Sequence, residues 1–137
     1  MTQQRTAHEF LHPQNWKSAK GYVNGVAAEG RIIFLAGQVG WNAQQKFESQ
    51  DFIEQTRQAL QNIVAIVHEA GGKPEHITRL TWFITDKKEY LSRLGEVGQA
   101  YRSVMGKHFP AMTMVQVADL IENEAKVEIE ASAVVPI

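Results

Sequence analysis

The sequence predicts an α+β domain in which two helices cover one face of a mixed β-sheet. Strand-like and helix-like segments follow one another in the order ββαβαββ, and this order favours helices on a single side of the sheet. With 137 residues and a hydrophobic content of 44%, the chain is long enough for one compact core.

The N-terminal part of the chain is predicted to contain an arm and two strands. Residues 1–18 have no clear period and form the expected arm, whereas residues 19–137 form the expected single domain. Strand character is found in segments 22–27 and 31–38, and Glu29-Gly30 supplies the turn between them.

A long helix is predicted to follow Asp51. Asp51 and Glu54 resemble a capping box, and Gly71-Gly72 with Pro74 ends the helix. The residues expected to face the core recur at helical spacing and are Phe52, Thr56, Ala59, Leu60, Ile63, Val67 and Ala70.

The C-terminal half is predicted to contain a strand, a second helix and two final strands. Segment 77–84 is rich in the β-branched and aromatic residues that are typical of strands. Asp86 opens a helix that ends at Gly106, and strands 113–120 and 125–135 flank a polar turn. The expected buried stripe of this helix consists of Tyr90, Leu94, Val97, Gly98, Tyr101, Val104 and Met105.

The predicted sheet has apolar residues on both faces. In segment 77–84, Leu80, Trp82 and Ile84 point to one side, and Phe83 points to the other beside Thr81. Helices on one face leave the second face uncovered. In a chain of this length the expected cover is another copy of the chain, so the pattern predicts a homo-oligomer. The alternative is a partly wet face with scattered apolar residues.

Composition argues against several classes of partner. The formal net charge is −1, which gives no basis for binding nucleic acid or an anionic membrane. The chain has no cysteine, so disulfides and thiolate metal sites are excluded. No apolar run approaches the ~20 residues of a membrane span, and the polar N-terminus lacks the apolar core of a signal peptide. We therefore expect a cytoplasmic protein.

Segment His8–His12 matches the H-E-x-x-H signature of zinc proteases. That chemistry needs both histidines on one face of a helix, but Pro13 biases His12 away from helical geometry. We expect an arm that docks through Phe10 and Leu11, and no metal site.

Five segments resemble, in order and in register, the reactive-intermediate deaminase family, also called RidA or YjgF. They are Gly21–Val26, Ala36–Val39, Gln55–Asn62, Phe109–Ala111 and Val127–Ala131, and the resemblance runs from about residue 19 to residue 136. It implies a chorismate-mutase-like α+β fold, a homotrimer, and ligand pockets in the clefts between subunits. It also implies hydrolysis of small enamines or imines to a carbonyl compound and ammonia, with neither a metal nor an organic cofactor.

The resemblance implies catalytic roles for two residues. Glu128 matches the carboxylate that positions the attacking water, and Tyr22 matches a pocket tyrosine whose hydroxyl orients substrate or water. Glu130 shares a strand face with Glu128 and is expected to be merely solvated.

The expected substrate-binding residues come from two other segments. Gly37 and Gln38 match the strand end that lines the cleft, where a glycine allows close backbone approach. Trp41 follows them, either as an aromatic wall of the pocket or in a plain packing role. The remaining expected residues are Met112, Thr113 and Met114.

Met112 is the main departure from the family pattern. Active members have an arginine directly after Phe-Pro-Ala, and this arginine clamps the substrate carboxylate. A thioether supplies none of that charge-assisted pairing. Met114, Gly98 and Ala36 stand where the family has cysteine, asparagine and serine, so the expected pocket is more apolar.

The sequence therefore predicts a deaminase-like hydrolase whose substrate differs from 2-aminoacrylate. One alternative is a trimer that binds a small metabolite without turnover, and another is that Arg79 or Arg102 reaches the pocket from a different direction. RNA cleavage is disfavoured because Lys87-Lys88 is the only adjacent basic pair.

Overall fold

The main sheet has four strands in the order β3-β6-β4-β5. The structure is a computed structural model that describes residues 3–137. Strand β6 is antiparallel to both β3 and β4, whereas β4 and β5 are parallel, so the sheet is mixed. The strands are β3 (Arg31–Val39), β4 (Ile77–Ile84), β5 (Ala111–Gln116) and β6 (Val127–Val135).

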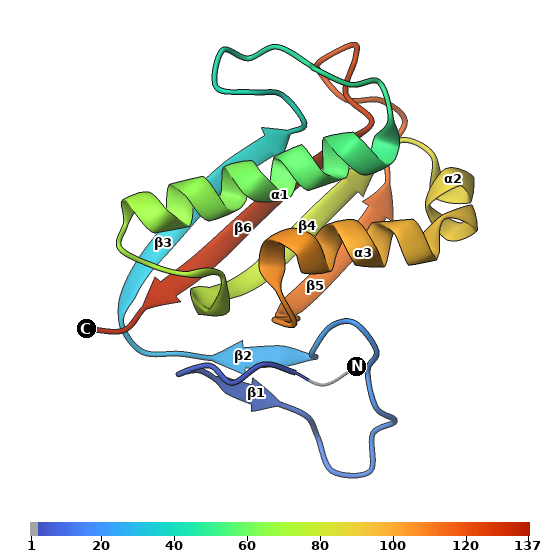
Figure 1. The fold of residues 1–137 in the computed structure, drawn as a ribbon. Coiled ribbons are helices and arrows are strands. Elements are labelled where there is room, and N and C mark those ends of the chain that lie inside the picture. The colour runs from blue at the N-terminus through green and yellow to red at the C-terminus, as the bar shows by residue number, and fades with distance from the viewer. Residues whose placement is uncertain (1–2) are drawn as a thin grey trace.

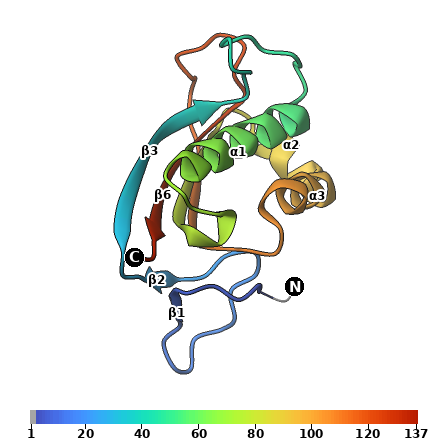
Figure 2. The same cartoon turned by 60° about the vertical axis from the view of Figure 1, so that its left-hand side comes forward.

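The helices lie on one face of this sheet, as Figures 1 and 2 show. They are α1 (Phe52–Glu69), α2 (Lys87–Ser92) and α3 (Leu94–Met105), and a short 3₁₀ turn, η1 (Pro74–His76), precedes β4. This arrangement confirms the predicted α+β class. The two final strands are not neighbours, because β4 lies between β5 and β6.

Alternation along β4 separates the buried face from the open face. Leu80, Trp82 and Ile84 are buried beneath the helices, whereas Thr81 and Phe83 are only partly covered on the opposite face. The prediction for this strand is therefore confirmed in both its bounds and its two faces.

The open face of the sheet carries exposed apolar side chains and is not covered by a helix (Figure 2). On β3, Ile32 is 60% exposed and Phe34 is 84% exposed. They pair in register with Val134 and Ser132 of β6. A single protomer therefore leaves large side chains in water on the face that the sequence predicts to be covered by another copy.

Helix α1 begins and ends as its flanking residues predict. The side chain of Asp51 accepts a hydrogen bond from the backbone N–H of Glu54, which is an N-cap interaction. The chain leaves the helix through Gly71, which has a φ of +81° that favours glycine. The side chains buried along α1 are Phe52, Ile53, Gln55, Thr56, Ala59, Leu60, Ile63 and Val67.

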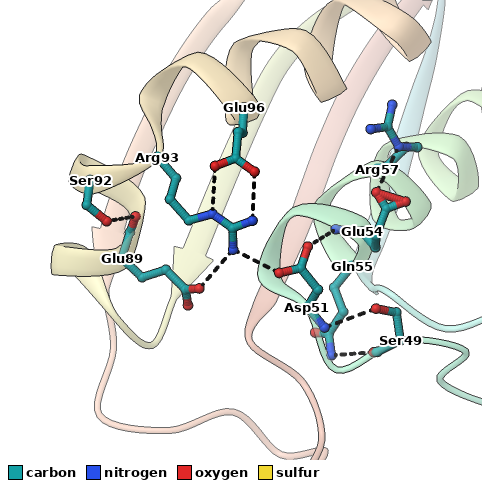
Figure 3. A network of polar contacts seen from close by, with 9 residues as sticks. All are labelled: Ser49, Asp51, Glu54, Gln55, Arg57, Glu89, Ser92, Arg93 and Glu96. Atoms are coloured by element: carbon teal, nitrogen blue, oxygen red, sulfur yellow. Dashed lines mark hydrogen bonds and ion pairs between the residues drawn. The ribbon is translucent and has the colours of Figure 1, made fainter.

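The second predicted helix is divided into α2 and α3 at Arg93. The Arg93 guanidinium donates two hydrogen bonds to Glu96 of α3, one to Glu89 of α2 and one to Asp51 at the start of α1 (Figure 3). Arg93 has non-helical dihedrals of −127° and 33°. Gly95 and Gly98 lower helix propensity just after this point. These tertiary contacts explain a break that the local period did not reveal.

The N-terminal arm docks on the domain and adds a small second sheet. Strand β1 (Glu9–Leu11) pairs antiparallel with β2 (Gly25–Ala27), which is only the end of the predicted strand 22–27. Gln3 exchanges hydrogen bonds with the backbone of Phe109. The predicted strand 22–27 was therefore too long, because its first half pairs little and only Val23 bridges to Ala111.

No helix in the described part of the chain combines the length and the apolar composition that a membrane span requires.

Candidate functional site

The carboxylate of Glu128 lies over the backbone of Gly37 on the open face of the sheet. A β-carbon at Gly37 would lie 3.0 Å from Cδ of Glu128 and 3.1 Å from its Cγ, and it would be nearer still to Oε2. Any side chain at position 37 would therefore displace the carboxylate. Gly37 and Glu128, which were proposed separately as site residues from the sequence, are therefore in contact.

A β-bulge brings these two residues together. The pairing of β3 with β6 shifts between Leu35 and Gln38, so Ala36 and Gly37 have no regular partner. After the shift, Val39 is the register partner of Glu128 on one side, and Phe83 of β4 is its partner on the other. Within the described residues, no hydrogen bond or ion pair engages the Glu128 carboxylate, so it is available to a ligand or to water.

Met112 and Met114 lie on the opposite, helix-covered face of the sheet. In the parallel pairing of β4 with β5, Met112 is in register with Leu80, and Met114 is in register with Trp82. Both methionines line a cavity of about 170 Å³ between this sheet edge and α2–α3. Thr113, between them, is exposed on the open face.

Tyr22 lies in a groove of about 480 Å³ between the docked arm and the segment before β2. Its side chain is exposed, and Lys20 and His12 also line this groove. Gly21 and Phe109 line both the groove and the methionine cavity, so Tyr22 lies close to the Met112 side of the molecule rather than to Glu128.

Gln38 and Trp41 lie at the far end of β3, beside α1. Both line a shallow depression on the helix side, where Asn62 donates hydrogen bonds to the carbonyls of Val39 and Trp41. The Trp41 ring packs against Phe47, with ring centroids 5.8 Å apart. Trp41 thus packs against Phe47 and also lines the depression.

One protomer therefore brings the expected site residues together in separate groups. Gly37 and Glu128 meet on the open face, and Met112 and Met114 meet on the helix face, with Tyr22 near the latter pair. The sheet itself separates the two groups within one protomer.

The aromatic residues that line the methionine cavity were not proposed from the sequence as site residues, and they are Trp82, Tyr90, Tyr101 and Phe109. Trp82 lines the cavity and stacks on Tyr101, with ring centroids 6.3 Å apart. Tyr90 lines it from α2, and partial burial raises the pKa of its hydroxyl above the usual value. The alternation in the sequence of β4 predicts that Trp82 lies beneath the helices. It does not predict the cavity, because the cavity depends on where α2 and α3 lie.

The H-E-x-x-H segment forms β1 instead of the helix that a zinc protease requires. His8 contacts the carbonyl of His76, and His12 contacts the carbonyl of Trp16. The two histidines thus have different backbone partners, and residues 3–137 contain no cluster of three or more potential metal ligands.

The fold places the chain in the class of Rid proteins. A crystal structure of a Rid family protein from Yersinia pestis, YyfB, matches with a TM-score of 0.83 at 27% identity, covering 93% of this chain and 98% of that one. Escherichia coli TdcF with bound serine matches with a TM-score of 0.65 at 33% identity, covering 92% of this chain and 98% of that one.

Sequence comparison gives the family. The family model described as endoribonuclease L-PSP matches residues 13–135, and the chain belongs to this family, which is the RidA/YjgF family. A RutC family protein of Pasteurella multocida is 32% identical over 92% of this chain and 97% of its own length. The 2-iminobutanoate/2-iminopropanoate deaminase of Escherichia coli is 36% identical over 82% of this chain and 86% of its own length.

Proposed function

We propose that this protein hydrolyses a small imine or enamine to a carbonyl compound and ammonia. The observation that supports this most directly is the unpaired Glu128 carboxylate held over Gly37. Relatives named as imine deaminases, such as the Escherichia coli protein, support the same class of reaction.

In the proposed reaction Glu128 positions and deprotonates a water molecule. The water oxygen attacks the electrophilic carbon of the C=N bond, and the nitrogen takes up a proton to give a carbinolamine. Collapse of this intermediate forms the C=O bond and releases ammonia. The bare backbone at Gly37 leaves room for the carboxylate and a water beside it. Tyr22 orients the substrate or the water in this proposal.

The proposed active form is a homotrimer with one site in each cleft between subunits. The exposed apolar residues Ile32 and Phe34 support association through the open face of the sheet. The separation of Glu128 from Met112 by the sheet also supports a cleft to which two copies contribute. The proposal keeps the cytoplasmic location that is expected from the sequence.

The proposed substrate differs from that of relatives with an arginine at the Met112 position. Met112 offers no positive charge to a substrate carboxylate. An imine with a less polar substituent is therefore the expected substrate. In this proposal Gly37 and Thr113 bind it from the open face, Met112 and Met114 bind it from the helix face, and Gln38 contributes from the end of β3.

Imine hydrolysis by the purified protein tests the proposal. Imines would be generated by an amino-acid oxidase from a panel that runs from small to bulky apolar amino acids. Glu128→Gln should lower turnover by about a hundredfold or more, because it removes the base. Glu130→Gln is the matched control on the same strand face and should retain activity. Equal activity of both variants would rule out the assigned role of Glu128.

A binding protein without turnover is the second candidate function, and Met112 favours it. In that case no imine is hydrolysed by the native chain, while a small metabolite raises Tm in a saturable way. Gain of activity in Met112→Arg would then indicate an intact scaffold. RNA cleavage is not part of the proposal, because Lys87-Lys88 is the only adjacent Lys/Arg pair in the sequence.

A further inference from the structure

The docked N-terminal arm covers a cluster of three histidines. His8 belongs to the arm, His76 to η1, and His108 to the loop before β5. His8 is 8% exposed, and His108 is fully buried. The ring centroids of His8 and His76 are 6.1 Å apart, and the ring of Phe10 in β1 lies at the same distance from His108. The burial of this cluster therefore depends on the arm.

His108 has no favourable place for a second proton. Its Nε2 lies 2.8 Å from the carbonyl oxygen of Ile77, and because a carbonyl only accepts, Nε2 carries the proton. The other ring nitrogen, Nδ1, is buried and has no hydrogen-bond partner among residues 3–137. Protonation of Nδ1 would create a buried charge and an N–H without an acceptor. Burial accordingly lowers the pKa of His108.

His76 already uses the nitrogen that would take up the second proton. Its Nδ1 accepts a hydrogen bond of 3.0 Å from the backbone N–H of Lys73, at the start of η1. A proton on Nδ1 would remove this acceptor. Burial also lowers the pKa of His76, as it does for His108.

The charged groups around the two rings do not compensate for burial. Glu75 favours the protonated form of both rings, whereas His8 opposes it for both and Lys73 opposes it for His76. From α3, the neutral hydroxyl of Tyr101 donates to the carbonyl of His108. The other charged residues along the arm and the loop before β5 are exposed, and they are Arg5, Glu9 and Lys107.

The arm is attached through a small set of hydrogen bonds. Besides the Gln3 side chain on Phe109, the Gln4 backbone N–H donates to Lys107, and the Thr6 hydroxyl donates to the carbonyl of Glu75. Strand β1 adds only three residues of pairing with β2. A segment held in this way can detach while the rest of the domain stays folded.

Release of the arm would change the groove that contains Tyr22. Phe10, Leu11 and His12 form the arm side of this groove, opposite the segment that carries Tyr22. The same release would return water to His76 and His108, because the arm is what covers them.

We propose that the docked arm, residues 3–11, is a latch that opens when His76 and His108 take up protons, and that its opening widens the groove beside Tyr22. The latch depends on the fold alone and does not rest on the proposed hydrolase function. With the arm released, both rings titrate near the ordinary pKa of 6.5. Docking is therefore complete above pH 6.5 and weakens below it, until the lower pKa of the docked state is passed. Uptake of two protons reduces the docking constant by at most about a hundredfold per pH unit.

Methyl NMR on the full-length chain between pH 8 and pH 5 tests the latch. The signals of Thr6 and Leu11 report on the arm, and the signal of the fully buried Ile63 in α1 reports on the domain. The arm signals should move to the positions of an unfolded peptide with a midpoint below pH 6.5, while the Ile63 signal stays in place. An arm that remains docked at pH 5 would overturn the proposal. Loss of the Ile63 signal together with the arm signals would also overturn it.

Two matched substitutions replace the rings by groups that do not titrate. His108→Gln keeps a side-chain N–H for the Ile77 carbonyl, and His76→Asn keeps an acceptor for the Lys73 N–H. The double variant should keep its arm docked at pH 5, and its Ile63 signal at pH 8 shows whether the domain is folded. Release of the arm at the same pH as in the native chain would contradict the assignment to these histidines.

A change in the arm itself provides a test that leaves every histidine in place. Gln3→Ala removes the hydrogen bonds to Phe109, so docking weakens and the midpoint of release should move to higher pH. Gln4→Ala is the control, because Gln4 attaches through its backbone N–H, and its midpoint should match that of the native chain. An unchanged midpoint in Gln3→Ala would refute the latch. All of these readouts follow the arm, so they hold whether or not the protein hydrolyses an imine.

Discussion

The carboxylate of Glu128 lies against the backbone of Gly37, at a point where any β-carbon would collide with it. The contact joins the strand that provides the proposed base to the bulge of the neighbouring strand. The position of the carboxylate thus depends on the absence of a side chain at residue 37.

Gly37→Ala should therefore reduce catalysis without unfolding the protein. The added methyl group displaces a flexible side chain rather than backbone atoms, so the fold should persist. Because small displacements of a catalytic group are costly, kcat/KM for imine hydrolysis should fall roughly tenfold or more. Gly25→Ala is the control, since its β-carbon would lie 3.4 Å from the nearest Leu11 atom, which is ordinary contact. Unchanged kcat/KM in Gly37→Ala would contradict the proposed geometry.

Arg93→Ala should destabilise the protein more than Arg57→Ala does. Arg93 bonds to carboxylates of three helices or their caps, whereas Arg57 pairs with Glu54 of its own helix and bonds to Ser103 (Figure 3 shows Arg93 and the Glu54 pair). Thermal unfolding at low and high salt would measure the decrease in Tm that each variant causes. High salt should narrow the difference in Tm between the two variants, because it screens the ion pairs.

Arg93→Ala should also raise the pKa of the Asp51 carboxyl group. The Arg93 guanidinium holds the pKa of Asp51 below its ordinary value of 3.8. In Arg93→Ala this pKa should rise, as measured by NMR titration of the carboxyl carbon. A pKa that stayed low would mean that the N-cap hydrogen bond to Glu54 alone is sufficient.

Stability should decline as the pH falls below about 6.5. Burial lowers the pKa values of His76 and His108 below the ordinary 6.5, because the charged imidazolium loses hydration. Below that pH the unfolded chain binds protons that the folded chain does not, so the free energy of unfolding decreases until the folded-state pKa is passed. Urea unfolding between pH 8 and pH 5 would measure this slope. His108→Gln should reduce this slope, because it removes one of the two histidines whose pKa is lowered by burial.

Phe34→Glu should dissociate the proposed trimer. Phe34 is 84% exposed on the open sheet face, and a buried unpaired carboxylate in an interface is strongly unfavourable. Ile121→Glu is the control, because Ile121 is also a large apolar residue, is 93% exposed and lies in the loop before β6. Light scattering should give three times the 15.4 kDa chain mass for native protein and the control, and one chain mass for Phe34→Glu. A native monomer would refute the trimer.

Local periodicity was sufficient to predict the elements that bury one face along their whole length. The bounds of β4 and the start of α1 follow from alternation and from capping residues close in sequence. The break at Arg93 did not follow, because one of its carboxylates, Asp51, lies 42 residues away. Strand β1 was missed for a similar reason, since three residues become a strand only through pairing with β2.

The candidate site residues were proposed one by one from the sequence, but their spatial arrangement was not. Gly37 and Glu128 were assigned through the resemblance to the family, yet their contact depends on a bulge that alternation does not reveal. The Met112 cavity depends on the angle at which α3 leaves Arg93. Trp82 joined the site only because its ring reaches the space beside the two methionines.

The central position of β6 in the sheet has a consequence for biosynthesis (Figure 1). Strands β3 and β4 are translated long before residues 127–135, which occupy the place between them. Until those residues emerge from the ribosome, each strand presents an unpaired edge and an apolar face to the surrounding solution. Completion of the sheet therefore waits for residues 127–135, and a nascent chain that stalls before residue 127 is expected to depend on chaperones.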